Sequence, residues 1–147
     1  MNNSLNKAKE VLKNHQNYGC DELSDYINRA LKLIDQFNEK KLELSEKESN
    51  ELDLLIKLHD TARNSEKVLE NLISASDLVN NADMRVYNLK NEVSENSNSS
   101  IIRLVYNIYL ILGEQLNDKE SLSLGALINK VFINKRDKLN KVKMLYV

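Results

Sequence analysis

Apolar residues recur at three- and four-residue steps along most of this chain, the spacing of one face of an α-helix. The pattern predicts a helix that begins after Asp21 and ends near Lys41, with apolar positions at Leu23, Tyr26, Ile27, Ala30, Leu31, Ile34 and Phe37. A shorter helix with a thinner apolar stripe is predicted from Ser4 to about Asn17.

A longer helical segment follows. Ser45 and Glu48 have the S-x-x-E spacing of a capping box, in which each side chain satisfies a free backbone N–H at a helix start. The pattern then runs through Leu55, Leu58, Ala62, Ser65, Leu69, Leu72, Ser76 and Val79, and slips to Ala82, Val86, Leu89 and Val93. We predict one long central helix over residues 46–93, about 70 Å if straight at roughly 1.5 Å per residue, with a kink or break near Asn80-Asn81.

The alternative for this segment is a continuous antiparallel coiled coil. Asp83 and Lys90 occupy the strict heptad positions after Val79, and such polar residues disfavour an unbroken seam. In either case the chain holds more apolar periodicity here than one helix needs. If the apolar seam on residues 55–93 is exposed, it would mark a docking face.

Residues 94–100, SENSNSS, have no periodicity and side chains that compete with the backbone for hydrogen bonds, so they predict a polar loop. Residues 101–112, IIRLVYNIYLIL, are almost wholly apolar. As a helix they place Arg103, Asn107 and Glu114 on one narrow polar stripe and bury the rest, which is typical of the central helix of a bundle. A strand is disfavoured because no second strand exists to pair with it.

The last helix is expected to start at Asp118 or Ser121, with an apolar stripe at Ile128, Val131, Phe132, Leu139, Val142 and Tyr146. The chain has no proline and only three glycines, so polar residues and not helix breakers separate its elements. The sequence therefore predicts an all-α fold: an antiparallel helical bundle of about five helices, forming a single domain over residues 1–147.

Charge is unevenly distributed. The chain has 21 basic and 22 acidic residues, but residues 129–147 contain a single acidic side chain, Asp137. This segment is predicted to form a basic amphipathic helix, which can bind a protein partner, phosphates or an anionic surface. The simpler interpretation is a core helix with lysines around its buried edge. The candidate partner- or phosphate-binding residues are Lys130, Lys135, Arg136, Lys138, Lys141 and Lys143.

One weak pattern of possible metal ligands is present. His59-Asp60, with an upstream histidine and downstream aspartates, resembles the His, His-Asp, Asp order of the HD-domain phosphohydrolases, which are all-helical. The resemblance implies a metal-dependent hydrolase whose ligands come from His15, His59, Asp60 and one of Asp77, Asp83 and Asp118. The simpler interpretation is a partly exposed His59 beside a solvated Asp60.

Other catalytic signals are missing from the sequence. It has no Gly-rich phosphate loop, no nucleophile elbow and no C-x-x-C pair, and the lone Cys20 is interpreted as a structural thiol. The first twelve residues lack the apolar core of a signal peptide, and no stretch is apolar enough to cross a bilayer. We therefore expect a cytoplasmic protein without cofactor or metal. The excess of Lys over Arg and the many Asn residues indicate a bacterial or phage origin.

The functional hypothesis is a small helical module that binds another protein, as an adaptor, inhibitor, chaperone or immunity-type factor, and is not an enzyme. It is expected to form a homodimer, because helices with exposed apolar seams commonly pair. The first alternative is a nucleic-acid or anionic-surface binder that uses the basic last helix. The second is the HD-type phosphohydrolase.

Overall fold

The computed structural model describes residues 2–16, 21–78 and 84–145. Of these, the side chains of residues 21, 73, 76–78, 84–92, 94–97 and 135–145 are outside the description. The described ranges form helices and no strand, which confirms the predicted all-α bundle of about five helices. The helices are α1 (Asn3–Asn14), α2 (Asp21–Glu39), α3 (Glu46–Leu78), α4 (Met84–Gln115) and α5 (Lys119–Leu145).

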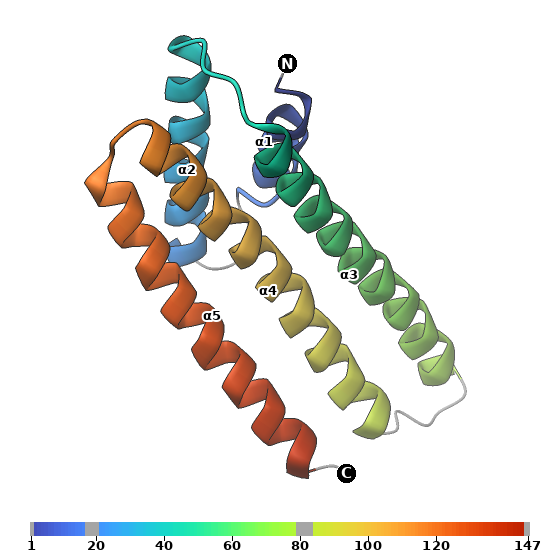
Figure 1. The fold of residues 1–147 in the computed structure, drawn as a ribbon. Helices are drawn as coiled ribbons and strands as arrows, with labels where there is room; N and C mark the ends of the chain where they lie inside the picture. Colours follow the sequence, from blue (N-terminus) through green and yellow to red (C-terminus); the bar gives the residue numbers. More distant parts are fainter. Residues whose placement is uncertain (1, 17–20, 79–83, 146–147) are drawn as a thin grey trace.

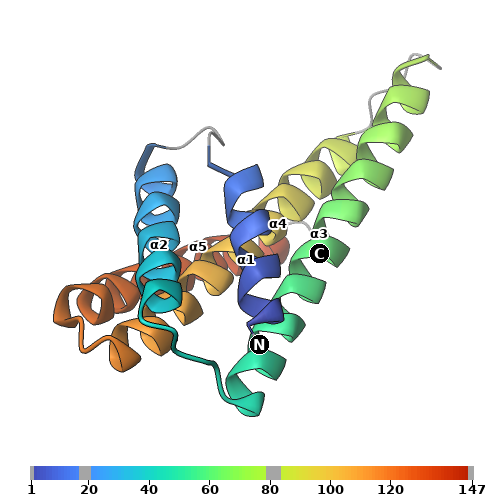
Figure 2. The same cartoon turned by 90° about the horizontal axis from the view of Figure 1, so that it is seen from above.

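Three long helices lie side by side and two shorter ones cover part of one side. In Figure 1, α3, α4 and α5 form a layer in which neighbouring helices run in opposite directions. Figure 2 shows α1 and α2 on one side of this layer, while the distal end of α3 extends beyond them. Helix α4 contacts all four other helices, so the prediction that residues 101–112 belong to the central helix is confirmed.

The described residues of 46–93 belong to α3 and α4, which lie against each other. Among the described residues α3 contacts α1 and α4, whereas α4 contacts all four other helices, so the central helix of the bundle is α4. The predicted kink or break at Asn80-Asn81 lies outside the described residues.

The predicted polar loop at residues 94–100 is wrong. Helix α4 runs without interruption from Met84 to Gln115 and includes this segment. Each serine or asparagine in a helix lowers its stability by about 0.5 kcal/mol relative to Ala. Packing of α4 between α3 and α5 outweighs that small local preference.

Two predicted helix starts are confirmed by their capping bonds. At α3, the Ser45 backbone N–H donates to Glu48 Oε1 (3.1 Å) and the Glu48 N–H donates to Ser45 Oγ (3.2 Å), a complete capping box. At α5, the Ser121 N–H donates to Asp118 Oδ1 (3.2 Å), so Asp118 is the cap. Glu48 also accepts two bonds from Gln115 Nε2, which ties the start of α3 to the end of α4.

Helices α2 and α4 end in the same way, with a residue of positive φ that is not glycine. After α2, Lys41 has φ 55° and the Leu42 N–H donates back to the Phe37 carbonyl at 3.3 Å. After α4, Asn117 has φ 55° and the Asp118 N–H donates to the Gly113 carbonyl at 2.8 Å. Both are Schellman motifs, in which glycine is the favoured residue.

Replacing Lys41 by Gly should therefore stabilise the protein. The left-handed conformation costs a non-glycine residue roughly 1–2 kcal/mol, and part of this is lost to the greater flexibility of an unfolded glycine, so a gain of about 1 kcal/mol is expected. Urea denaturation of Lys41→Gly measures it. Asn117→Gly is the matched control and should gain less, since Asn tolerates this conformation better. A loss of stability in Lys41→Gly would contradict the expectation.

The core is mainly aliphatic and centred where α1 and α2 cover α4. Its largest fully buried side chain is Tyr109 of α4, whose hydroxyl donates to the Tyr26 carbonyl of α2 at 2.5 Å. Burial raises the pKa of this phenol. Helices α4 and α5 approach closely at Gly125, where a Cβ would lie 3.3 Å from the Cβ of Tyr109.

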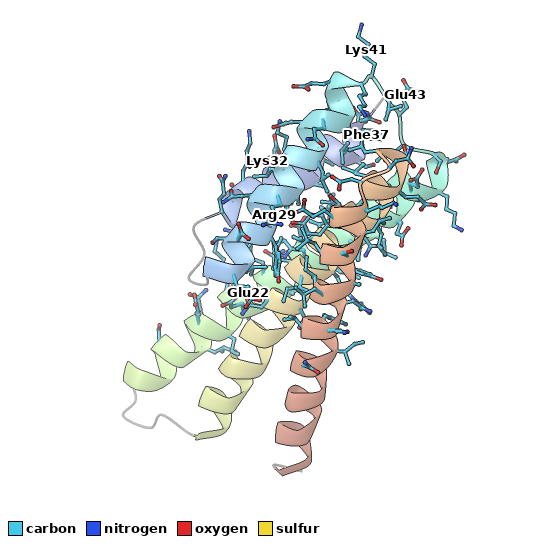
Figure 3. The ribbon with its side chains drawn as sticks, turned by 90° about the vertical axis from the view of Figure 1, so that its left-hand side faces the viewer. Glu22, Arg29, Lys32, Phe37, Lys41 and Glu43 are labelled. Atoms are coloured by element: carbon cyan, nitrogen blue, oxygen red, sulfur yellow. The ribbon has the colours of Figure 1, made fainter. Side chains whose placement is uncertain are left out.

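Exposed ion pairs link the covering helices to their neighbours. Lys9 of α1 pairs with Asp35 of α2 at 2.7 Å. Arg29 of α2, labelled in Figure 3, pairs with Glu120 of α5 at 3.1 Å. Solvent-exposed pairs contribute little stability, about 0–1 kcal/mol each. They orient the helices on a core whose stability comes from apolar burial.

Candidate functional site

Helix α3 has apolar side chains on two different faces. Its inward face buries Leu52, Leu55, Ile56 and His59, and α3 packs there against α1 and α4. Four large apolar residues on another face are exposed, with accessible fractions of 59% for Leu54, 44% for Leu58, 59% for Val68 and 57% for Leu72. With three exposed small residues between and beyond them they form the outer seam: Leu54, Leu58, Thr61, Ser65, Val68, Leu72 and Ala75.

The apolar seam predicted on residues 55–93 is partly buried and partly exposed. The periodic pattern in the sequence crossed between two faces: Leu55 is buried, whereas Leu58 and Leu72 are exposed. Leu54 and Val68 were missed, although their spacing to Leu58 and Leu72 is also four residues. Periodicity alone could not distinguish two overlapping stripes on one helix.

A groove of about 430 Å³ lies beside the outer seam, along the face of α4 between α3 and α5. Glu51 and Leu55 of α3 form one wall, Ile102, Arg103, Tyr106 and Asn107 of α4 the floor, and Asn129, Phe132 and Ile133 of α5 the other wall. Leu55 is one turn from both Glu51 and Leu58 on α3, so the groove wall and the outer seam are adjacent. The groove, whose lining includes both polar and apolar side chains, therefore borders the outer seam.

Arg103 and Asn107 of the predicted polar stripe of α4 line this groove, whereas Glu114 does not. Arg103 and Glu114 are exposed, as expected, and Asn107 is half-buried. The Arg103 guanidinium lies over the Phe132 ring, 4.9 Å from its centroid, which keeps the charge at the surface and covers an aromatic face. Asn107 Nδ2 donates to the Arg103 carbonyl at 2.9 Å.

Two histidines far apart in sequence meet in the core. His15, just after α1, and His59 of α3 have their Nε2 atoms 2.8 Å apart and their rings nearly perpendicular, at 82°. Only 7% of His15 and 1% of His59 are accessible. The interpretation of His59 as partly exposed is therefore wrong, whereas Asp60 is exposed as expected. Sequence carried no sign of the pairing beyond the rarity of histidine.

Burial sets the protonation of this pair. It lowers the pKa of His15 to about 4, helped by His59 and by the positive charge of Arg63, while Glu66 acts in the opposite direction. Burial likewise lowers the pKa of His59, against the effect of Asp60. Both rings are neutral near pH 7, so the Nε2–H of one ring donates a hydrogen bond and the unprotonated Nε2 of the other ring accepts it. His59 Nδ1 has no hydrogen-bond partner among the described residues.

The residues of the HD-like pattern are only partly brought together. His15 and His59 meet, but Asp118 caps α5, and the side chains of Asp77 and Asp83 lie outside the described residues. Among the side chains that the structure describes, no group of three or more His, Cys, Asp or Glu is placed to hold a metal ion.

The basic residues of the C-terminal segment lie on α5. Lys130 is exposed. The side chains of Lys135, Arg136, Lys138, Lys141 and Lys143 lie outside the described residues, so their arrangement stays a prediction.

Within the described ranges, no helix is both long and apolar enough to cross a membrane. Comparison with known proteins finds no protein-family model, no curated protein and no solved structure that matches this chain. The outer seam of α3 and the groove next to it are accordingly the features on which a functional proposal rests.

Proposed function

We propose that this protein acts by binding another protein through the outer seam of α3. It is an interaction module of the adaptor, inhibitor, chaperone or immunity type, and not an enzyme. The observation that carries the proposal is the exposure of four large apolar side chains in line on one helix: Leu54, Leu58, Val68 and Leu72.

Burial of these side chains would favour association, since each Å² of apolar surface removed from water contributes about 25 cal/mol. Contiguous apolar patches are uncommon on monomers and typically mark interaction sites. The neighbouring groove supports the same proposal. A helix that lies along α3 would extend towards the groove wall, where the exposed Glu51 offers it a carboxylate.

The test is affinity capture with tagged protein in extract of the source organism, to which a differently tagged copy of the same chain is added. Three baits are compared: the wild type, Leu58→Lys/Leu72→Lys in the outer seam, and Leu127→Lys on α5 as a control. Leu127 is 47% exposed and outside the seam, so this control alters a similar apolar residue elsewhere.

We expect a partner that binds the wild type and the Leu127→Lys control equally. Remeasured with purified components, its affinity for the seam variant should be at least about tenfold weaker, or 1.4 kcal/mol. If every protein captured by the wild type, including the added copy, binds the seam variant equally well, the proposal is wrong.

A further inference from the structure

The outer seam has the spacing of a coiled-coil interface. Its residues alternate steps of four and three from Leu54 to Ala75, so Leu58, Ser65 and Leu72 occupy one heptad position and Leu54, Thr61, Val68 and Ala75 the other. The part between Leu54 and Leu72 is about 27 Å long at roughly 1.5 Å per residue. A complementary partner is therefore another helix of about five turns.

The two polar residues at the centre of the outer seam, Thr61 and Ser65, have hydroxyl groups that already donate hydrogen bonds within α3. Thr61 Oγ1 donates to the Lys57 carbonyl at 2.9 Å, and Ser65 Oγ donates to the Thr61 carbonyl at 3.0 Å. Because both hydroxyl protons are used inside α3, covering these side chains leaves no donor unsatisfied. They present small surfaces that allow a second helix to approach closely.

The outer seam is complementary to itself when two copies run in opposite directions. If the two-fold axis passes through the seam between Thr61 and Ser65, Leu54 faces the partner's Leu72, Leu58 faces the partner's Val68, and Thr61 faces the partner's Ser65. All four exposed apolar residues then meet apolar residues, and the hydroxyl residues meet each other. A shift by one heptad instead places Leu72 against Thr61 and Val68 against Ser65.

The flanking residues favour the antiparallel arrangement over a parallel one. On one flank of the seam are Leu55, which is buried in the core of its own chain, and the half-buried Ala62 and Leu69. On the other flank are the exposed Lys57, Asn64 and Asn71. In an antiparallel pair each flank faces its own copy, so apolar meets apolar and polar meets polar. A parallel pair would place Lys57 beside Ala62 and Asn64 beside Leu69.

Charge raises no barrier to this arrangement. In the antiparallel register Lys57, the only charged residue among these flanking positions, faces the neutral Asn71 of the second copy. We propose that two copies of this chain pair as an antiparallel two-helix coiled coil through the outer seam of α3. This inference rests on the proposed function and names the bound protein as a second copy.

The experiment is sedimentation equilibrium of the full chain, up to roughly 300 µM, where a dimer of micromolar affinity would be almost fully formed. Besides the wild type it uses Leu58→Lys/Val68→Lys, Leu58→Lys/Val68→Glu, and Leu127→Lys as the control outside the seam. Circular dichroism verifies that each variant keeps its helices, which the exposure of the substituted residues favours.

We expect the wild type and Leu127→Lys to form dimers, and the Lys/Lys variant to remain at the monomer mass of 17.0 kDa. The Lys/Glu variant should recover dimer relative to Lys/Lys, because each Lys then faces a Glu of the other copy. In a parallel pair Lys would face Lys, so recovery is specific to the antiparallel register.

A wild type that stays monomeric at all concentrations overturns the inference, as does a Lys/Glu variant no more dimeric than Lys/Lys. Loss of the dimer in Leu127→Lys would place the interface elsewhere and also overturn it. These failures are separate from failure of the proposed function. A monomeric wild type that still captures a different protein in a seam-dependent way leaves the proposed function standing.

Discussion

Acidification from pH 7 to pH 4 should destabilise this protein through the buried pair of His15 and His59. In the native state both rings are held neutral and the pKa of His15 is lowered to about 4. An unfolded histidine titrates at about 6.5 and binds a proton more readily. Between these two values the unfolded chain carries more protons, so stability falls as the pH decreases.

The expected loss is large for one residue. At about 1.4 kcal/mol for each pH unit between the two pKa values, less the part not yet lost at pH 4, His15 alone accounts for about 3 kcal/mol. The contribution is fully present above pH 6.5 and is lost as the pH falls towards 4. The pKa of His59 is lowered in the same direction and adds to the effect.

Urea denaturation at a series of pH values measures this loss, with His15→Leu/His59→Leu as the matched variant. The variant keeps every carboxylate, so acid effects from Asp and Glu are common to both proteins. Its stability should decline less steeply than that of the wild type between pH 6.5 and 4. Parallel curves for the two proteins would show that the pair is not the acid-sensitive group.

Replacing Phe37 by Ala should lower the free energy of unfolding by about 3 to 5 kcal/mol. Phe37 lies near the end of α2, labelled in Figure 3, and no part of its side chain is accessible. Its removal takes away a large buried apolar group and leaves a cavity, because the neighbouring helices can relax only partly.

Leu72→Ala is the control for this prediction. Leu72 is on the outer seam, where substitution in a monomer should change stability by no more than about 0.5 kcal/mol. Thermal or urea unfolding at low protein concentration compares the two variants. If Leu72→Ala were as destabilising as Phe37→Ala under these conditions, the seam would belong to the core of one chain and not to a docking face.

Predictions from the sequence were correct for helix starts, where nearby residues form the capping bonds, and for the most apolar helical segment. The Ser45–Glu48 capping box forms the predicted bonds, and Asp118, one of the two predicted starts of the last helix, caps it, since short-range geometry alone decides these contacts. The apolar run 101–112 was identified as the central helix because so much apolar surface is stable only in the middle of a bundle.

Local signals failed where packing outweighs propensity. Residues 94–100 have poor helix formers, yet they continue α4 because the flanking segments pack against α3 and α5. The pairing of His15 with His59 spans 44 residues and needs α1 to lie against α3. Nothing near either residue in the sequence specifies that contact.

Apolar spacing and capping residues act within a few turns of the chain, so a bundle of amphipathic helices can be predicted from the sequence. Which stripe of α3 faces the core, and thereby which apolar residues remain outside, depends on how the helices pack. The other helices cover one face of α3 and leave the opposite face open to solvent. The four large apolar side chains on that open face, Leu54, Leu58, Val68 and Leu72, form the exposed outer seam.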